Sequence, residues 1–304
     1  MRTLQVVLAF AVVLGAGPSS SRASPAGPRT YPTPRQAAEA LAAAASAEDV
    51  STLLAIFGPD GSALVNSGDE VQDRRDRAKF AELAAEKLDV IVAPKHRHVA
   101  TVVVGSDAWP FPVPLVEEGG KWSFAAKQGL EAVLERRIGA NELDAIEICR
   151  GYVEAQKEYA AEDRTGTGVL QYAQKVVSSE GKRDGLVWRN PDGSLGGPVA
   201  ERIAVAISEG YSDKTKPFHG YHFEILKRQG PHAPLGTLDY VVDGKMIGGF
   251  ALAAWPAEYA VSGVKTFIVS HDGVVYEKDL GRDTAKIVAR MDRYDPDKSW
   301  KPVP

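Results

Sequence analysis

Residues 141–162 read NELDAIEICRGYVEAQKEYAAE, and this stretch decides how the second half of the chain is organised. Apolar side chains recur along it every three or four residues, which predicts an amphipathic helix over 142–162, the longest in the chain. They are Leu143, Ile146, Cys149, Val153 and Ala160. Asn141 is a suitable N-cap for this helix, and 139–141 is expected to separate it from an earlier helix over 129–138.

Beyond this helix the pattern changes to a loop and then to strands. Residues 166–197 are rich in glycine and polar side chains, with a short helix predicted over 169–176. A further short helix is predicted over 200–209. Strands are predicted over 221–226, 238–242, 248–255, 266–270 and 274–276. Asp272-Gly273 indicates a hairpin between the last two strands, so the second half predicts one long helix followed by an antiparallel sheet.

The first half places helices before strands. Thr33-Pro34 opens a first helix that is rich in alanine, and a second helix is predicted over 50–57. Ser67-Gly68-Asp69-Glu70 predicts a capping box at the start of a third helix, which runs to about residue 87. Strands are predicted over 90–93, 99–104, 112–116 and 122–124, with a hairpin at 118–121. The chain is therefore expected to be α+β, with an N-terminal lobe over 35–139 and a C-terminal lobe over 140–304.

The N-terminus has the pattern of a secretory signal peptide. Arg2 precedes an apolar, uncharged run over 3–17, and Ser21-Arg22-Ala23 offers small residues for cleavage. We expect residues 1–23 to be removed and 24–34 to form a proline-rich linker. The protein would then be exported, to the periplasm or beyond the cell, with no later segment that could span a membrane.

Composition and motifs exclude several classes of function. The chain has 36 Lys and Arg against 40 Asp and Glu, so it lacks the basic excess of a nucleic-acid-binding protein. Cys149 is the single cysteine, and its aliphatic neighbours predict a buried thiol. The sequence contains no zinc-protease, serine-hydrolase or phosphate-loop motif, so no catalytic residue, metal ligand or cofactor is predicted.

Several unusual blocks carry a family resemblance. They are Phe57-Gly58-Pro59-Asp60-Gly61, Ser67-Gly68-Asp69, and the segments 109–116, 136–143, 182–188, 219–223, 239–246 and 249–263. In these blocks the chain resembles a family of exported bacterial proteins catalogued as domain of unknown function 2950, over about residues 33–280. The resemblance implies export from a bacterial cell and brings no reaction with it.

Two weaker resemblances concern the separate lobes. The order of a long helix from 141, a loop and antiparallel strands ending in the 272–275 hairpin resembles the soluble domain of type IV pilins and pseudopilins. Pilins carry a membrane-spanning half-helix where this chain has a polar lobe, so assembly through that stem is not expected. The order of elements in the N-terminal lobe resembles the cone-shaped, nuclear-transport-factor-like fold, which implies a pocket.

Six residues are candidates for binding. Trp188, Arg189 and Asp192 lie in the glycine-rich loop 182–197, where an aromatic ring beside polar groups suits a sugar, a peptide or a protein. The alternative is that Trp188 pins this loop to the sheet. His219, Tyr221 and His222 begin the strand over 221–226. His219 and His222 could hold a metal ion with Glu224 only if His232 or His271 completed the ligand set; the alternative is that they are hydrogen-bonded histidines at a strand entrance.

The sequence therefore predicts an exported, non-catalytic binding or assembly protein of the bacterial envelope. Its partner would be an envelope or extracellular protein or glycan, bound through the C-terminal lobe. The alternative is a small-ligand binder or hydrolase with a pocket in the N-terminal lobe. The candidate residues for that alternative are Asp89, His96, His98 and Asp107.

Overall fold

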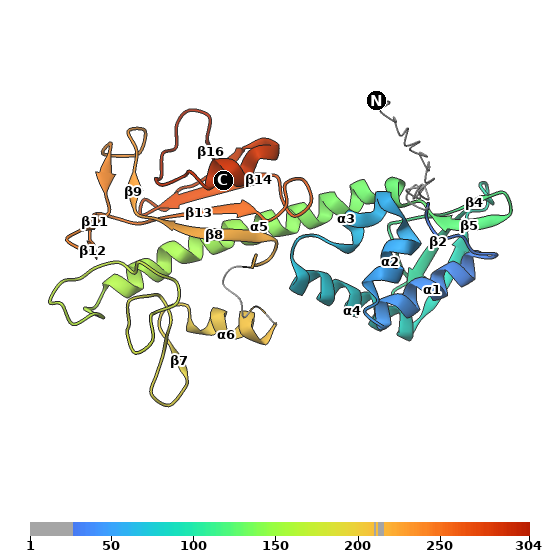
Figure 1. The fold of residues 1–304 in the computed structure, drawn as a ribbon, viewed down its shortest axis with the longest axis horizontal. Coiled ribbons are helices and arrows are strands. Elements are labelled where there is room, and N and C mark those ends of the chain that lie inside the picture. Colours follow the sequence, from blue (N-terminus) through green and yellow to red (C-terminus); the bar gives the residue numbers. More distant parts are fainter. Residues whose placement is uncertain (1–26, 210, 212–215) are drawn as a thin grey trace, which may run out of the picture.

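The fold is α+β, as predicted, and a single long helix runs along the molecule (Figure 1). The computed structural model describes residues 27–209, 211 and 216–304. The predicted signal peptide over 1–23 and the first residues of the predicted linker lie outside the described residues. Buried apolar side chains form two separate clusters. The N-terminal core includes Ala126 at the start of the long helix, and the C-terminal core includes residues from Ala145 to Tyr159 in its second half.

Four helices and one antiparallel sheet surround the N-terminal core. The helices are α1 (Pro34–Ser46), α2 (Val50–Phe57), α3 (Ser62–Val65) and α4 (Glu70–Glu86), with the 3-10 turn η1 (Pro59–Gly61). The strands are β1 (Leu88–Val92), β2 (Val99–Val104), β3 (Trp109–Pro110), β4 (Leu115–Glu118) and β5 (Lys121–Phe124). Their order is β1-β2-β4-β5, with β3 also paired to β2. Thr33 and Asp49 cap α1 and α2 through their side-chain oxygens, as residues of these types do at helix N-termini.

The C-terminal core lies between the long helix α5 (Ala126–Ala160) and a five-stranded antiparallel sheet. The sheet order is β16-β15-β14-β13-β8. The sheet strands are β8 (Tyr221–Leu226), β13 (Ala251–Pro256), β14 (Lys265–Ser270), β15 (Val275–Asp279) and β16 (Lys301–Pro302). Shorter elements are β6 (Trp188–Arg189), β7 (Leu195–Gly196), α6 (Ala200–Ser208), β9 (Arg228–Gln229), β10 (Leu238–Asp239), β11 (Val241–Val242), β12 (Lys245–Met246), η2 (Gly281–Asp283) and α7 (Thr284–Val288).

The predicted helix break at 139–141 is wrong. Helix α5 continues through this point for 35 residues, so residues 139 and 140, where the lobe boundary was placed, lie inside it. Asn141 is buried in the helix instead of capping it, and its Nδ2 donates a hydrogen bond of 2.9 Å to the carbonyl of Ser262. Helix propensity describes only local sequence, so it could not predict this hydrogen bond to an acceptor 121 residues away.

Two further local predictions are wrong. The segment 169–176 is not helical; its Tyr172 pairs with Met246 of β12 as an isolated bridge. The N-cap of α4 is Asp69, whose side chain accepts from the amides of Val71 and Gln72, whereas the capping box predicted Ser67. Strands β2 and β8 and helix α2 have the predicted bounds.

The single cysteine is a core residue, as predicted. Cys149 is fully buried on α5, and burial raises the pKa of its thiol to about 12. A thiol with such a pKa is not nucleophilic at neutral pH. Within the described part of the chain, the helices include none with the length and apolar character needed to cross a bilayer.

Candidate functional site

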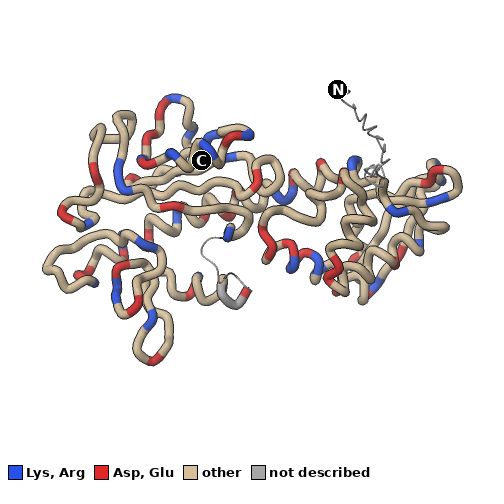
Figure 2. Tube along the Cα trace, in the orientation of Figure 1, with Lys and Arg blue, Asp and Glu red and all other residues tan. Residues whose placement is uncertain are grey.

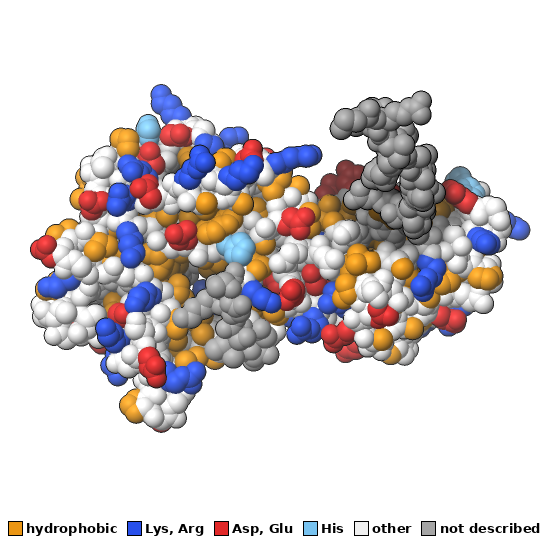
Figure 3. Space-filling model, in the orientation of Figure 1, with side chains coloured by type: hydrophobic (Ala, Val, Ile, Leu, Met, Phe, Trp, Pro, Cys, Tyr) orange, Lys and Arg blue, Asp and Glu red, His pale blue; other side chains and the backbone are white. Residues whose placement is uncertain are grey.

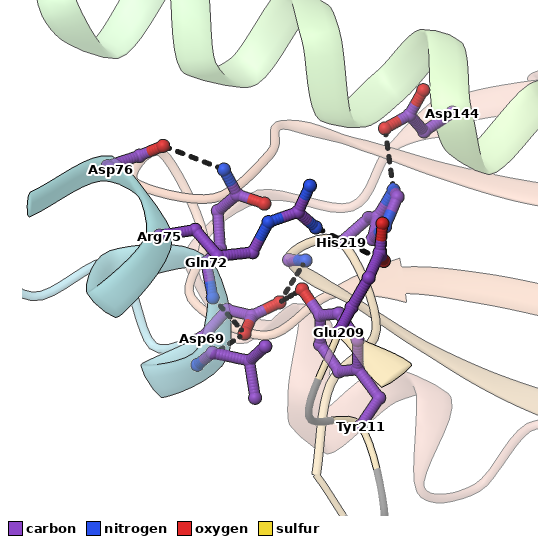
Figure 4. A network of polar contacts seen from close by, with 10 residues as sticks. Asp69, Gln72, Arg75, Asp76, Asp144, Glu209, Tyr211 and His219 are labelled. Carbon is purple, nitrogen blue, oxygen red and sulfur yellow. Dashed lines mark hydrogen bonds and ion pairs between the residues drawn. The ribbon is translucent and has the colours of Figure 1, made fainter. Parts of the chain in front are cut away.

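Asp69 connects the two sides of the molecule through a buried carboxylate (Figure 4). Its Oδ1 accepts the amides of Val71 and Gln72 at the start of α4. Its Oδ2 accepts the hydroxyl of Tyr211 at 3.0 Å and the amide of Gly220 at 2.9 Å. Burial and the nearby Asp69 charge raise the pKa of Tyr211, so the phenol remains a donor. A carboxylate that satisfies four donors in this way joins the N-terminal core to β8.

His219 lies beside Asp69 and between two other carboxylates (Figure 4). Its Nδ1 is 2.8 Å from Asp144 Oδ2 on α5, and its Nε2 is 3.6 Å from Glu209 Oε2. Glu209 also pairs with Arg75 of α4 at 3.1 Å. His219 Nε2 is buried and makes no hydrogen bond within the described residues. The residues joined in this arrangement include no serine, threonine or cysteine, so it does not form a nucleophile–histidine–acid triad.

Tyr221 and His222 follow this network into β8. Tyr221 is completely buried, and its hydroxyl donates to the carbonyl of Lys265 at 2.9 Å. The ring of His222 lies 5.7 Å from that of Trp255. Burial lowers the pKa of His222, while the negative charge of Asp69 opposes this shift. The structure therefore brings together His219, Tyr221 and His222. The buried Tyr221 hydroxyl is already bonded to the Lys265 carbonyl.

The other three predicted residues lie in the β6–β7 hairpin, apart from β8 (Figure 1). Trp188 is only 7% exposed, and its ring lies 5.4 Å from the guanidinium of Arg164 and 5.2 Å from that of Arg183. Arg189 donates to the carbonyl of Gly193, and Asp192 accepts from the amide and hydroxyl of Ser194. Trp188 thus anchors the hairpin, and the exposed Arg189 and Asp192 shape its turn.

A polar cavity of about 200 Å³, named here the C-terminal cavity, lies where the segment after α5 folds back. Its lining includes Tyr159, Tyr172, Gln174, Lys175, Asp184 and Lys227. Lys175 donates to Asp184 at 2.8 Å and to the hydroxyl of Ser179 at 2.6 Å. Burial by itself would raise the pKa of Asp184, but hydrogen bonds from Lys175 and Ser179 outweigh it and lower the pKa to about 2. The cavity therefore presents fixed charges of both signs.

One wall of the C-terminal cavity is a tight turn centred on Asp163. Its carboxylate accepts the amides of Thr165, Gly166, Thr167 and Gly168. Gln171, which lines the cavity, donates from its amide to the hydroxyls of Thr165 and Thr167. Sequence reasoning did not identify any of the cavity residues, although Gly166-Thr167-Gly168 after an aspartate is a turn signal that could have drawn attention to this wall.

A second cavity, the N-terminal cavity, has a volume of about 130 Å³ and lies among α1–α5. Its lining includes Leu53, Phe57, Phe80 and Phe111, together with Arg77 and Arg137. The buried carboxyl of Asp73 also lies there, and burial raises its pKa. The four residues that the sequence suggested for this pocket do not line it; they are Asp89, His96, His98 and Asp107.

Surface charge of both signs is mixed over the whole trace (Figure 2). On the face shown in Figure 3, basic and acidic side chains also alternate with hydrophobic ones. Among the described residues no group of three or more His, Cys, Asp or Glu is arranged to hold a metal ion, so His219, His222 and Glu224 do not form such a group.

Comparison with known proteins gives a family. No curated protein and no solved structure matches the chain. A family model does match, over residues 28–303, which include every site described above. The chain therefore belongs to the family described as Protein of unknown function (DUF2950).

Proposed function

We propose that this protein is an exported, non-catalytic binding protein of the bacterial envelope, and that it binds a glycan in the C-terminal cavity. The observation that carries the proposal is the lining of that cavity. It combines two tyrosine rings, two side-chain amides, two ammonium groups and a carboxylate within about 200 Å³.

Sugars are recognised by this combination of groups. Each hydroxyl both donates and accepts, so it is matched by carboxylate acceptors, ammonium donors and amides that do both. Asp184 and Gln174 supply acceptors, and Lys227 is in no ion pair within the described residues, which leaves its ammonium free to donate to a ligand. The cavity is smaller than the roughly 300–1,000 Å³ typical of drug-sized ligands, so it suits one sugar unit or a chain end.

Hydrogen bonds already hold the side chains of the cavity wall in place. Ligand binding therefore costs less side-chain conformational entropy. Asp184 is held by Lys175 and by the amide and hydroxyl of Ser179. Tyr159 donates to the carbonyl of Arg183, the residue whose guanidinium also lies over Trp188. The β6–β7 hairpin and the cavity are therefore parts of one supported region, and its exposed residues Arg189 and Asp192 would extend the binding surface.

Export and the pilin-like character of the C-terminal lobe belong to the same proposal. The leader pattern over 1–23 supports export. The order of a long helix and then antiparallel β8, β13, β14 and β15 supports a pilin-like lobe. Fractionation of the native host tests export: we expect a mature chain that starts near residue 24 in the periplasm or medium. Recovery of the full-length chain in the cytoplasm would overturn this part.

Co-sedimentation with insoluble cell-wall glycan tests the binding proposal. Lys227→Gln and Gln174→Ala should each weaken binding about 5- to 20-fold, because each removes one hydrogen-bonding group from the ligand. The control is Lys301→Gln, an exposed lysine on β16 that does not line the cavity. No sedimentation of the wild-type protein, or equal binding by the cavity variants and the control, would contradict the proposal.

A further inference from the structure

We propose that the N-terminal cavity is a second, separate binding site, and that it takes a small aromatic carboxylate. The ring would lie among the apolar side chains, and the carboxylate would pair with the guanidiniums of Arg77 and Arg137. This inference does not depend on glycan binding at the C-terminal cavity, because the two cavities share no lining residue.

The size and lining of the cavity fit a single benzene ring. Its volume is about 130 Å³, and Leu41, Leu53 and Phe57 in its lining are each nearly fully buried. An enclosed apolar core cavity of roughly 150 Å³ binds benzene, and this half-open, mostly apolar cavity offers a comparable volume. Filling such a space restores the dispersion contacts that the lining atoms lack.

Three phenylalanine rings of the lining favour an aromatic guest over an aliphatic one. Phe57 and Phe111 are stacked with centroids 6.2 Å apart, and Phe80 is tilted against Phe111 at 5.2 Å. Ring pairs with such offset and tilted geometries contribute about 0.5–1.5 kcal/mol beyond their buried area. A fourth ring among them would extend the same set of contacts.

On the polar side of the cavity, one donor of Arg77 has no hydrogen-bond partner within the described residues. Arg137 donates to the carbonyls of Ala63 and Leu64, and Arg77 makes one long bond of 3.4 Å to the carbonyl of Val65. Arg77 Nε is buried and has no hydrogen-bond partner within the described residues, and the charges of Arg77 and Arg137 act on the Asp73 carboxyl in the same lining. A ligand carboxylate would supply an acceptor for Arg77 Nε through charge-assisted hydrogen bonds.

Each acid of the lining already accepts at least one hydrogen bond. Both oxygens of Asp73 accept the amide of Ser67, and Asp76 accepts from the side-chain amide of Gln72. The buried atom of the lining that has no partner within the described residues is the donor Arg77 Nε, which favours an anionic or carbonyl-bearing ligand. Among such ligands a carboxylate matches a guanidinium best, because both are planar and can form two parallel bonds.

Titration calorimetry with benzoate as the probe tests this inference. Benzyl alcohol has the ring without the charge, and acetate has the charge without the ring. We expect benzoate to bind the wild-type protein, and we expect acetate and benzyl alcohol to bind at least about 10-fold more weakly. Arg77→Gln should weaken benzoate binding about 10- to 100-fold, whereas Arg74→Gln, an exposed position on the same helix, should leave it unchanged.

Methyl NMR of the wild-type protein keeps the test independent of variant folding. Benzoate should shift the methyl signals of Leu41, Leu53 and Val65, which line the cavity. Ala45→Leu, which adds carbon atoms to the lining, should abolish these shifts. No benzoate binding, equal binding of benzyl alcohol, or shifts confined to other regions would each overturn the inference.

Discussion

Asp69 is a buried side chain that makes hydrogen bonds to both the start of α4 and the segments before β8. Its carboxylate accepts two amides at the start of α4 and two donors, Tyr211 and Gly220, from the far side. We predict that Asp69→Ala lowers the free energy of unfolding by about 2–4 kcal/mol, because it removes a cap and leaves buried donors unpaired. Urea denaturation followed by circular dichroism measures this loss.

Asp49→Ala is the matched control for that variant. Asp49 caps α2 through the amide of Thr52 and is exposed, so its loss should lower the free energy of unfolding by clearly less than the loss of Asp69. Equal losses for the two variants would mean that Asp69 acts as a helix cap alone. The contact with Tyr211 and Gly220 would then contribute no stability.

His222 makes stability depend on pH. Burial lowers its pKa in the folded protein below 6.5, so the unfolded chain binds this proton more readily. The part of the folding stability that depends on a neutral His222 is fully present above pH 6.5, and it is lost as the pH falls from 6.5 to the pKa of His222 in the folded protein. His222→Gln should therefore make the fall in urea midpoint between about pH 7.5 and pH 5.5 shallower. The control His96→Gln changes an exposed histidine; a slope altered equally by both variants would contradict the assignment.

At the residue scale, the sequence could identify Asp69 as part of a helix start. It could not show that Asp69 also accepts hydrogen bonds from Tyr211 and Gly220. Tyr211 and Gly220 lie 142 and 151 residues away along the chain, and no local pattern joins positions so far apart. His219, Tyr221 and His222 were found because histidines and a tyrosine at a strand entrance are conspicuous. The acidic partners of His219, which are Asp144 and Glu209, lie elsewhere in the chain and carry no such signal.

At the scale of elements, helix α5 shows how tertiary contacts override a break signal. Gly139 and Asn141 suggested an end, yet the helix continues because side chains on both sides of this point find distant partners. Arg137 donates to the carbonyl of Ala63, and Glu142 accepts the amides of Val264 and Lys265 at 2.9 Å. Periodicity predicted both halves of α5 but could not show that they join.

The continuity of α5 gives a stability prediction with a built-in control. A Cβ at Gly139 would meet open space, so Gly139→Ala should raise the free energy of unfolding by about 0.5–1 kcal/mol. A Cβ at Gly129 would lie 2.6 Å from Val113 Cα, so Gly129→Ala should lower it by about 1–3 kcal/mol. Chemical denaturation of both variants measures the difference. Destabilisation by Gly139→Ala would contradict an uninterrupted helix at this position.

The segment 169–176 failed as a helix for a reason that a sequence window does not contain. Gln156 of α5 reaches Ala173, donating to its carbonyl and accepting its amide, both at 2.8 Å. The amide of Tyr172 donates to the carbonyl of Met246 at 2.8 Å. With these backbone groups already paired, a helical conformation would lose hydrogen bonds to gain others.

At the scale of the whole molecule, fold class could be predicted from sequence, but the residues that line the cavities could not. The change from helical to alternating patterns in each half predicted α+β, because those patterns reflect which face of each element is buried. A cavity is formed by side chains from several elements; α1, α2, α4 and α5 all contribute to the N-terminal one. Its position depends on packing distances that no single pattern encodes.

The most direct test of glycan binding is an amide chemical-shift map of the mature protein titrated with a soluble cell-wall oligosaccharide. The account predicts saturable shifts that are largest at Tyr172, Gln174, Lys175 and Asp184, all in the lining of the C-terminal cavity. Unchanged spectra at millimolar oligosaccharide, or shifts that avoid these four residues, would contradict it.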